Sequence, residues 1–220
     1  MTIAFKGPLP PYGQFRDFLP AGDLKALLDW ALANEDRFSP ARTKDRTGHI
    51  SSEAPRERIA LVLRDLGPLD GLLRERLLDI LPQAMVAGGS SGAEPLSLEL
   101  ELTAYGDGAF YAPHVDIPMG AGRQSLGAAR GEDRVLSAVS YFHQEPKGFS
   151  GGELRLHRFG SGPGDSGQAG IDHVDIEPHR NSLAVFPSRA RHEVRPVACP
   201  SGRFADYRFA LNCWYCRPLA

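Results

Sequence analysis

From Leu96 onward the chain breaks into short segments that alternate apolar and polar residues. The first, "LSLELELTAY" (96–105), has the period of two expected of a strand covered on one face. The strand candidates that follow are "AFYAPHV" (109–115), "RVLSAVSYFHQ" (134–144), "GELRLHRF" (152–159), "IDHVDIEP" (171–178), "NSLAVFPS" (181–188), "HEVRPVA" (192–198) and "YRFALNCWYC" (207–216). Gly, Pro and Ser turns separate them without intervening helices, which favours an antiparallel jelly-roll or cupin-like double-stranded β-helix.

The first ninety residues follow a helical period instead. "GDLKALLDWALANEDRF" (22–38) and "LDGLLRERLLDILPQAMVA" (69–87) place leucines three and four residues apart, with Pro82 as an end or kink. A chain of 220 residues with 42% hydrophobic content can bury one sizeable core. We therefore expect one domain, in which a mostly helical part (1–90) packs on a β-helix core (96–218).

Composition excludes several classes of protein. A net charge of −2 provides no general attraction for nucleic acid or an anionic membrane, and no apolar run approaches the roughly 20 residues of a membrane span. The three cysteines, Cys199, Cys213 and Cys216, are odd in number, and alternation puts the last two on opposite faces of a strand. These features predict a cytoplasmic protein with neither a nucleic-acid nor a membrane partner.

A metal site is indicated by "YGDGAFYAPHVD" (105–116). His114 and Asp116 stand two residues apart, so one strand face or strand end can direct both to the same ion, and His192 in "SRARHEVRPV" supplies a third ligand. Two histidines and one carboxylate are the facial triad of non-haem Fe(II) oxygenases. His173 and Asp175 have the same spacing and are an alternative pair, but they lie only nineteen residues before His192, so we favour the first pair.

The order of four motifs resembles the Fe(II)- and 2-oxoglutarate-dependent dioxygenases, in particular their prolyl 4-hydroxylase-like branch. The motifs are "YGDGAFYAPHVD", "RVLSAVSYFHQEPKGFSGGELRL", "NSLAVFPSRARHEVRPV" and "YRFALNCWY". The resemblance implies an enzyme that uses Fe(II), 2-oxoglutarate and O2, with ascorbate as a candidate reductant. It further implies hydroxylation of a C–H bond, coupled to decarboxylation of 2-oxoglutarate to succinate and CO2.

The same resemblance implies roles for residues around the iron. Arg208 on the last strand is the expected anchor of the distal carboxylate of 2-oxoglutarate, with Arg203 as its rival. The family often has a hydroxyl residue two positions after the arginine, and this chain has Ala210 there. Tyr105 and Tyr141 are expected to help bind the co-substrate.

Three residues are candidates for the substrate side of the site: Tyr111, Arg123 and Trp214. Arg123 lies in the loop 117–134, a candidate lid. A prolyl residue, a free amino acid and a small metabolite all remain open as substrates. Two alternative functions also remain: a non-catalytic metal-binding sensor or binding module, and a cupin-type metal-dependent isomerase that does not use 2-oxoglutarate. The oligomeric state is not predicted.

Overall fold

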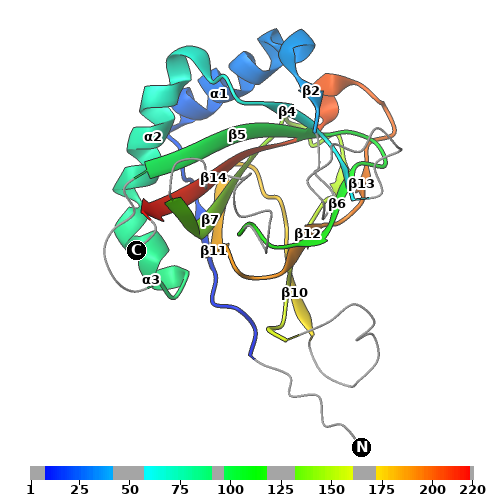
Figure 1. Ribbon diagram of the computed structural model, residues 1–220. Helices are drawn as coiled ribbons and strands as arrows, with labels where there is room; N and C mark the ends of the chain where they lie inside the picture. Colours follow the sequence, from blue (N-terminus) through cyan, green and yellow to red (C-terminus); the bar gives the residue numbers. More distant parts are fainter. Residues whose placement is uncertain (1–7, 42–56, 91–96, 118–131, 161–171, 219–220) are drawn as a thin grey trace, which may run out of the picture.

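The computed structural model describes residues 8–41, 57–90, 97–117, 132–160 and 172–218, which fold mainly into β-strands (Figure 1). The large sheet has the strand order β1 (Gly13–Arg16), β11 (Ser182–Pro187), β7 (Glu132–Phe142), β14 (Arg208–Pro218), β5 (Ser97–Tyr105), β4 (Leu61–Leu63) and β2 (Ser39–Pro40). The smaller sheet has the order β10 (His173–Ile176), β9 (Leu154–His157), β12 (His192–Val194), β6 (Phe110–His114) and β3 (Arg58–Ile59). β8 (Ser150–Gly151) pairs with β13 (Val197–Ala198), and neighbouring strands in all three sheets are antiparallel.

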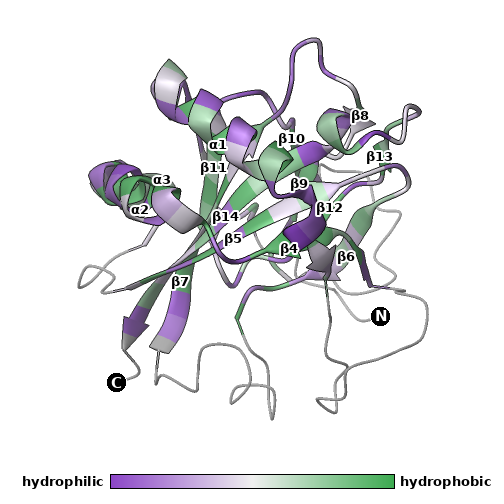
Figure 2. Ribbon diagram, turned by 90° about the horizontal axis from the view of Figure 1, so that it is seen from above, coloured by the Kyte–Doolittle hydropathy of each residue, from purple (hydrophilic) through white to green (hydrophobic). Residues whose placement is uncertain are grey.

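Three helices cover one face of the large sheet. They are α1 (Ala21–Ala33), α2 (Asp70–Asp79) and α3 (Leu81–Ala87), and Figure 2 shows them on the side of the sheet away from β6. Their buried leucines, such as Leu27 and Leu77, share a core with Leu102 and Leu211 of the sheet. Short 3-10 turns complete the described helical structure at Glu35–Arg37, Gly67–Leu69 and Phe204–Asp206.

The polar residues that alternate with leucines in β5 do not face solvent as they would on a surface strand. Leu100 and Leu102 point into the core under the helices, whereas Glu99, Glu101 and Tyr105 line a cavity between the two sheets. The same inner face of the large sheet carries Arg208, since it pairs in register with Tyr105. The polar half of the pattern therefore lines a cavity inside the fold.

All eight strand segments expected from the sequence are present, with ends that differ by a few residues. The segment 192–198 is two strands, because Pro196 separates β12 from β13. The second helical segment divides at Ile80, and Pro82 stands in the first turn of α3. Periodicity does not predict β1, β2, β3, β4 and β8, because these strands are only two to four residues long.

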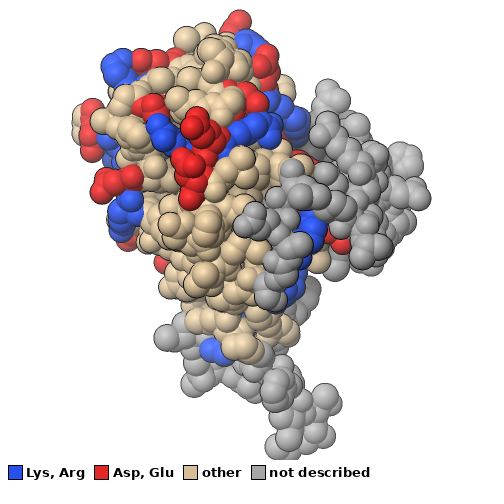
Figure 3. Space-filling view, turned by 90° about the vertical axis from the view of Figure 1, so that its left-hand side faces the viewer, with Lys and Arg blue, Asp and Glu red and all other residues tan. Residues whose placement is uncertain are grey.

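Three further properties of the described chain concern its cysteines, its surface charges and its helices. The three cysteines are buried thiols without a disulfide. Acidic and basic side chains are interspersed in the upper half of the face shown in Figure 3, and most of the described lower half is uncharged. Among the described residues, the helices are all too short or too polar to cross a membrane.

Candidate active site

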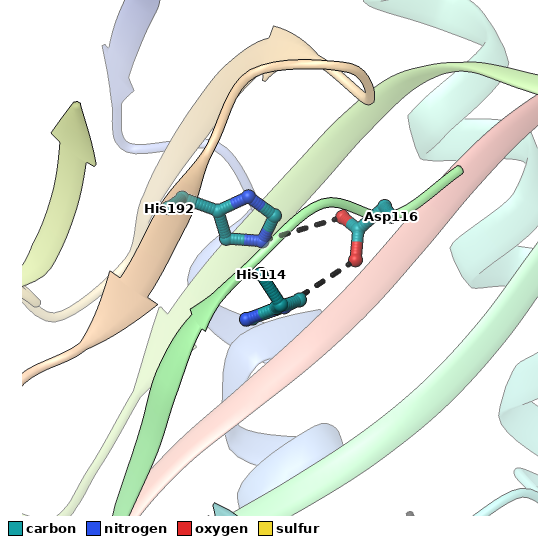
Figure 4. Close-up of side chains that lie close together, drawn as sticks. All are labelled: His114, Asp116 and His192. Carbon is teal, nitrogen blue, oxygen red and sulfur yellow. Dashed lines mark ion pairs between the residues drawn. The ribbon is translucent and has the colours of Figure 1, made fainter. Parts of the chain in front are cut away.

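His114, Asp116 and His192 come together at the edge of the cavity (Figure 4). His114 ends β6 and His192 begins β12, and the two residues are partners in the antiparallel register. One nitrogen or oxygen atom from each side chain lies within 4.8 Å of the other two. Asp116 Oδ1 is 3.6 Å from Nε2 of His114, and Asp116 Oδ2 is 3.5 Å from Nε2 of His192. Among the described residues these three form the one such group of metal-binding side chains.

Backbone carbonyls orient both imidazole rings. The Nδ1 atoms of His114 and His192 each lie 2.9 Å from a carbonyl oxygen, of Ala112 and Ala190 respectively. A carbonyl can only accept, so Nδ1 carries the proton and donates it, which leaves the Nε2 lone pairs available to a metal.

One serine hydroxyl and one backbone hydrogen bond hold Asp116 in place. Ser137 Oγ donates to Asp116 Oδ2 at 2.5 Å, and the Asp116 amide donates to the Ser188 carbonyl at 2.9 Å. Burial alone would raise the pKa of Asp116, but His192, His114 and the Ser137 hydroxyl hold it well below its usual range. Burial, together with the neighbouring His114, lowers the pKa of His192 to about 4. An ionised carboxylate and a neutral imidazole are the forms that bind a metal.

The chemistry of this donor set fits Fe(II). Two imidazole nitrogens and one carboxylate on one side of an ion leave the opposite coordination positions open to a second ligand. Because both Nε2 atoms and the carboxylate already face one point, a metal would require little rearrangement of the described side chains.

Arg208 is a second unusual feature of the cavity. Its side chain is 1% exposed and lies between the rings of Tyr105 and Tyr141, with the guanidinium carbon 5.0 and 4.9 Å from their centroids. Nε donates to the Gly152 carbonyl at 2.7 Å, but neither Arg208 Nη2 nor Tyr141 Oη finds a hydrogen-bond partner among the described residues. Burial raises the pKa of Tyr141 to about 12, with the Arg208 charge acting in the opposite direction. A neutral phenol and an unmatched guanidinium are a fitting cradle for a carboxylate.

The His114, Asp116 and His192 group and Arg208 line one cavity of about 990 Å³. Its wall includes His114, Asp116, His192, Arg208, Tyr105, Tyr111, Asn212 and Trp214. A cavity of this volume holds a small bidentate acid together with part of a second molecule.

The substrate-side candidates lie around the same cavity where the structure describes them. The Tyr111 ring stacks on His114 with centroids 3.5 Å apart, and Trp214 packs under the Arg134 guanidinium at 3.9 Å. Arg134 also forms an ion pair with Glu99. Arg123 and most of the loop 117–134 lie outside the described residues, so the lid remains a prediction.

The rival residues lie elsewhere. Arg203 is 74% exposed, forms an ion pair with Asp206 at 2.7 Å and is not among the residues lining the cavity. Asp175 is occupied by Arg155, whose Nε and Nη2 each donate to it at 2.7 Å, on the edge strand β10. His173 lies 4.0 Å from Asp175 on the same strand. In the smaller sheet, β9 lies between this pair on β10 and His192 on β12.

Several residues of the site were not identified from the sequence. Ser137 and Asn212 lie on strands that were predicted, on the inner face of the sheet, but nothing local marks that face as the cavity side. Thr103 is the register partner of Ala210, the position at which the family often has a hydroxyl residue. Thr103 Oγ1 donates to the Ala210 carbonyl at 3.3 Å. Arg58 follows a stretch without a clear period, so no signal in the sequence indicated its place in the wall.

Comparisons with known proteins agree with this geometry. A family model described as the 2OG-Fe(II) oxygenase superfamily matches residues 100–216. An uncharacterized PKHD-type hydroxylase from Synechocystis sp. (strain ATCC 27184 / PCC 6803 / Kazusa) is 32% identical over 203 residues, which are 92% of this chain and 62% of that protein. The chain thus spans less than two thirds of the length of this relative.

Solved structures share the double-stranded β-helix fold. A prolyl-4-hydroxylase from Pseudomonas putida matches with a TM-score of 0.60 and 24% identity, over 96% of this chain and 94% of the other. A prolyl hydroxylase from Trichoplax adhaerens, solved with a hypoxia inducible factor peptide, matches with a TM-score of 0.62 and 19% identity, over 94% and 83% of the two chains. Because the family model covers more than half of the 220 residues and its iron-binding donor types are present in the cavity, the chain belongs to the 2OG-Fe(II) oxygenase superfamily.

Proposed function

We propose that this protein is an Fe(II)- and 2-oxoglutarate-dependent dioxygenase that hydroxylates a C–H bond. His114, Asp116 and His192 would hold the iron, and Arg208 would hold the distal carboxylate of 2-oxoglutarate beside Tyr105 and Tyr141. Iron and 2-oxoglutarate, when bound, supply the oxidising chemistry, in which O2 is consumed and 2-oxoglutarate loses CO2 to become succinate.

The observation that carries this proposal is the state of Arg208. A buried guanidinium without a carboxylate partner among the described residues is costly, unless a ligand provides the missing charge. Its planar fork suits a carboxylate, and it opens on the same cavity as the metal-binding side chains. A metal-dependent isomerase of the cupin type has no need of this second charge.

The other residues of the cavity would orient the reactants. Ser137 keeps Asp116 ionised and directed at the metal, and the two carbonyls fix the histidine rings. Tyr111 and Trp214 would line the side on which the substrate enters. A prolyl residue, a free amino acid or a small metabolite is proposed as the substrate class.

An anaerobic titration with Fe(II) and 2-oxoglutarate tests the proposal. The wild-type protein should develop the visible charge-transfer band of an iron-chelated 2-oxo acid. Arg208→Ala should weaken 2-oxoglutarate binding by about 10- to 150-fold, the equivalent of roughly 1.5–3 kcal/mol for a charged hydrogen bond. Arg203→Ala is the matched control, because it removes an exposed arginine outside the cavity, and it should behave as wild type.

The outcomes also separate the alternatives. Metal binding without a band would favour a cupin-type enzyme, and a band without O2 consumption or succinate, with ascorbate present, would favour a sensor. An effect of Arg203→Ala as large as that of Arg208→Ala would overturn the assignment of the anchor.

A further inference from the structure

Three planar groups are stacked beside the proposed iron site. The Arg58 guanidinium lies 4.8 Å from the centroid of the Tyr111 ring, and that ring lies 3.5 Å from the His114 ring at an angle of 16°. Arg58 and Tyr111 are register partners on β3 and β6, which brings the guanidinium over the ring. The stack therefore ends on one of the proposed iron ligands.

Glu101 holds the far end of this stack. It is 3% exposed on the inner face of β5, and its Oε1 accepts from Arg58 Nη2 at 3.0 Å. Its Oε2 lies 2.6 Å from Nη2 of Arg64, which is 70% exposed. One buried carboxylate of the large sheet thus fixes a guanidinium of the smaller sheet across the cavity.

Stability alone does not account for this pair. Arg58 Nε is buried without a hydrogen-bond partner among the described residues, so the guanidinium is incompletely matched. Buried ion pairs often contribute less to stability than apolar residues of similar volume would. A role in the site would explain why the charges stand there.

The His114 ring needs support that its hydrogen bond does not provide. The bond from Nδ1 to the Ala112 carbonyl fixes one edge of the ring but leaves its tilt free. The Nε2 lone pair lies in the ring plane, so a tilt directs it away from the metal. Tyr111 covers the ring face and restricts this tilt.

We infer that Arg58 is a positioning residue for the metal site: held by Glu101, it presses Tyr111 onto His114 and fixes the plane of this ligand. The inference rests on the proposed function, because it takes His114 as a metal ligand. Outer partners of metal ligands commonly change metal affinity by about 10- to 100-fold when they are removed.

Binding of Co(II) to the purified protein tests the inference without any turnover. Arg58→Met should weaken Co(II) binding about 10-fold and change the visible Co(II) spectrum, and Arg58→Lys, which keeps the charge but loses the planar face, should fall between it and wild type. Arg37→Met is the matched control, since Arg37 also pairs with a carboxylate, Asp65, and lies 5.8 Å from an aromatic centroid, that of Trp30. It is not among the residues lining the cavity and should bind Co(II) as wild type.

Two double variants distinguish positioning from plain structural support. In Arg58→Met/Glu101→Met no buried charge is left unpaired, so thermal stability should recover while Co(II) binding stays weak. In a Tyr111→Leu background, which should itself bind Co(II) weakly, Arg58→Met should add little, because its effect passes through the ring.

Three results would count against the inference. They are wild-type Co(II) affinity in Arg58→Met, recovery of affinity together with stability in Arg58→Met/Glu101→Met, and simple additivity with Tyr111→Leu. Failure of the wild-type protein to bind Co(II), or unchanged binding in His114→Ala, would instead refute the proposed metal site.

Discussion

At the scale of single residues, Arg208 contrasts with Arg134. Arg208 is buried and Arg134 is partly buried, and both lie beside aromatic rings in the same cavity. Arg134 has Glu99 as an acidic partner, whereas Arg208 has none among the described residues. An unmatched buried charge is unfavourable in the ligand-free protein. We therefore expect Arg208 to lower the stability of the ligand-free protein while it strengthens ligand binding.

Replacing each arginine by methionine should therefore have opposite effects on thermal stability. Arg208→Met removes the unmatched charge, so the melting temperature of the ligand-free protein should stay the same or rise, while 2-oxoglutarate binding is lost. Arg134→Met leaves Glu99 half-buried without its partner, so the melting temperature should fall. A larger loss of stability in Arg208→Met than in Arg134→Met would contradict this account.

At the scale of elements, the turn between β8 and β9 determines where Arg208 lies. Gly151 and Gly152 have φ angles of +71° and +73°, which side chains disfavour. The Gly152 carbonyl accepts from Arg208 Nε. A Cβ at Gly152 would lie 2.6 Å from Arg208 Cδ and 2.9 Å from Val197 Cγ2, so the turn leaves no room for a side chain.

Gly152→Ala should thus combine backbone strain with displacement of Arg208. We expect a loss of stability greater than the roughly 1–2 kcal/mol of left-handed strain, together with weaker 2-oxoglutarate binding. Gly202→Ala is the control, because Gly202 has a φ of +61° but its Cβ would meet nothing within 4 Å. Denaturant unfolding and ligand titration measure the two effects; equal losses in both variants, with 2-oxoglutarate binding intact, would rule out the displacement.

At the scale of the whole molecule, the residues proposed to bind iron and 2-oxoglutarate come from both sheets. His114 and His192 lie on strands of the smaller sheet, and Arg208 lies on the large one. A metal with 2-oxoglutarate bound to it would connect the sheets through the cavity, so binding should stabilise the fold as a whole.

Mn(II) and 2-oxoglutarate added together should raise the melting temperature. A ligand concentration of a hundred times Kd stabilises the folded state by about 2.7 kcal/mol. For a chain of this size, this corresponds to a rise in melting temperature of about 5 to 11 °C. A chelator should reverse the shift, and His114→Ala should abolish it. A shift that survives in His114→Ala would mean that the ligands bind elsewhere.

Local patterns in the sequence were sufficient to predict the helices, the longer strands and part of the site. The period of two predicted β5, and Pro82 marked the break between α2 and α3, since both depend on neighbouring residues alone. The spacing of His114 and Asp116 similarly predicted that they would converge. The polar residues of β5 could not be assigned to a cavity, because a strand looks the same whether its polar face meets solvent or a ligand.

The sequence by itself determined the order of the longer strands and of the helices, the paired spacing of His114 and Asp116, and, through its resemblance to a family, the kind of chemistry to expect. Only the tertiary structure brought His192 against that pair, separated Arg208 from Arg203, and joined Arg58 to Glu101. The physical reason is that short-range periodicity sets the side of a strand on which a residue lies. Which strands become neighbours depends on burial and hydrogen bonding across the whole chain.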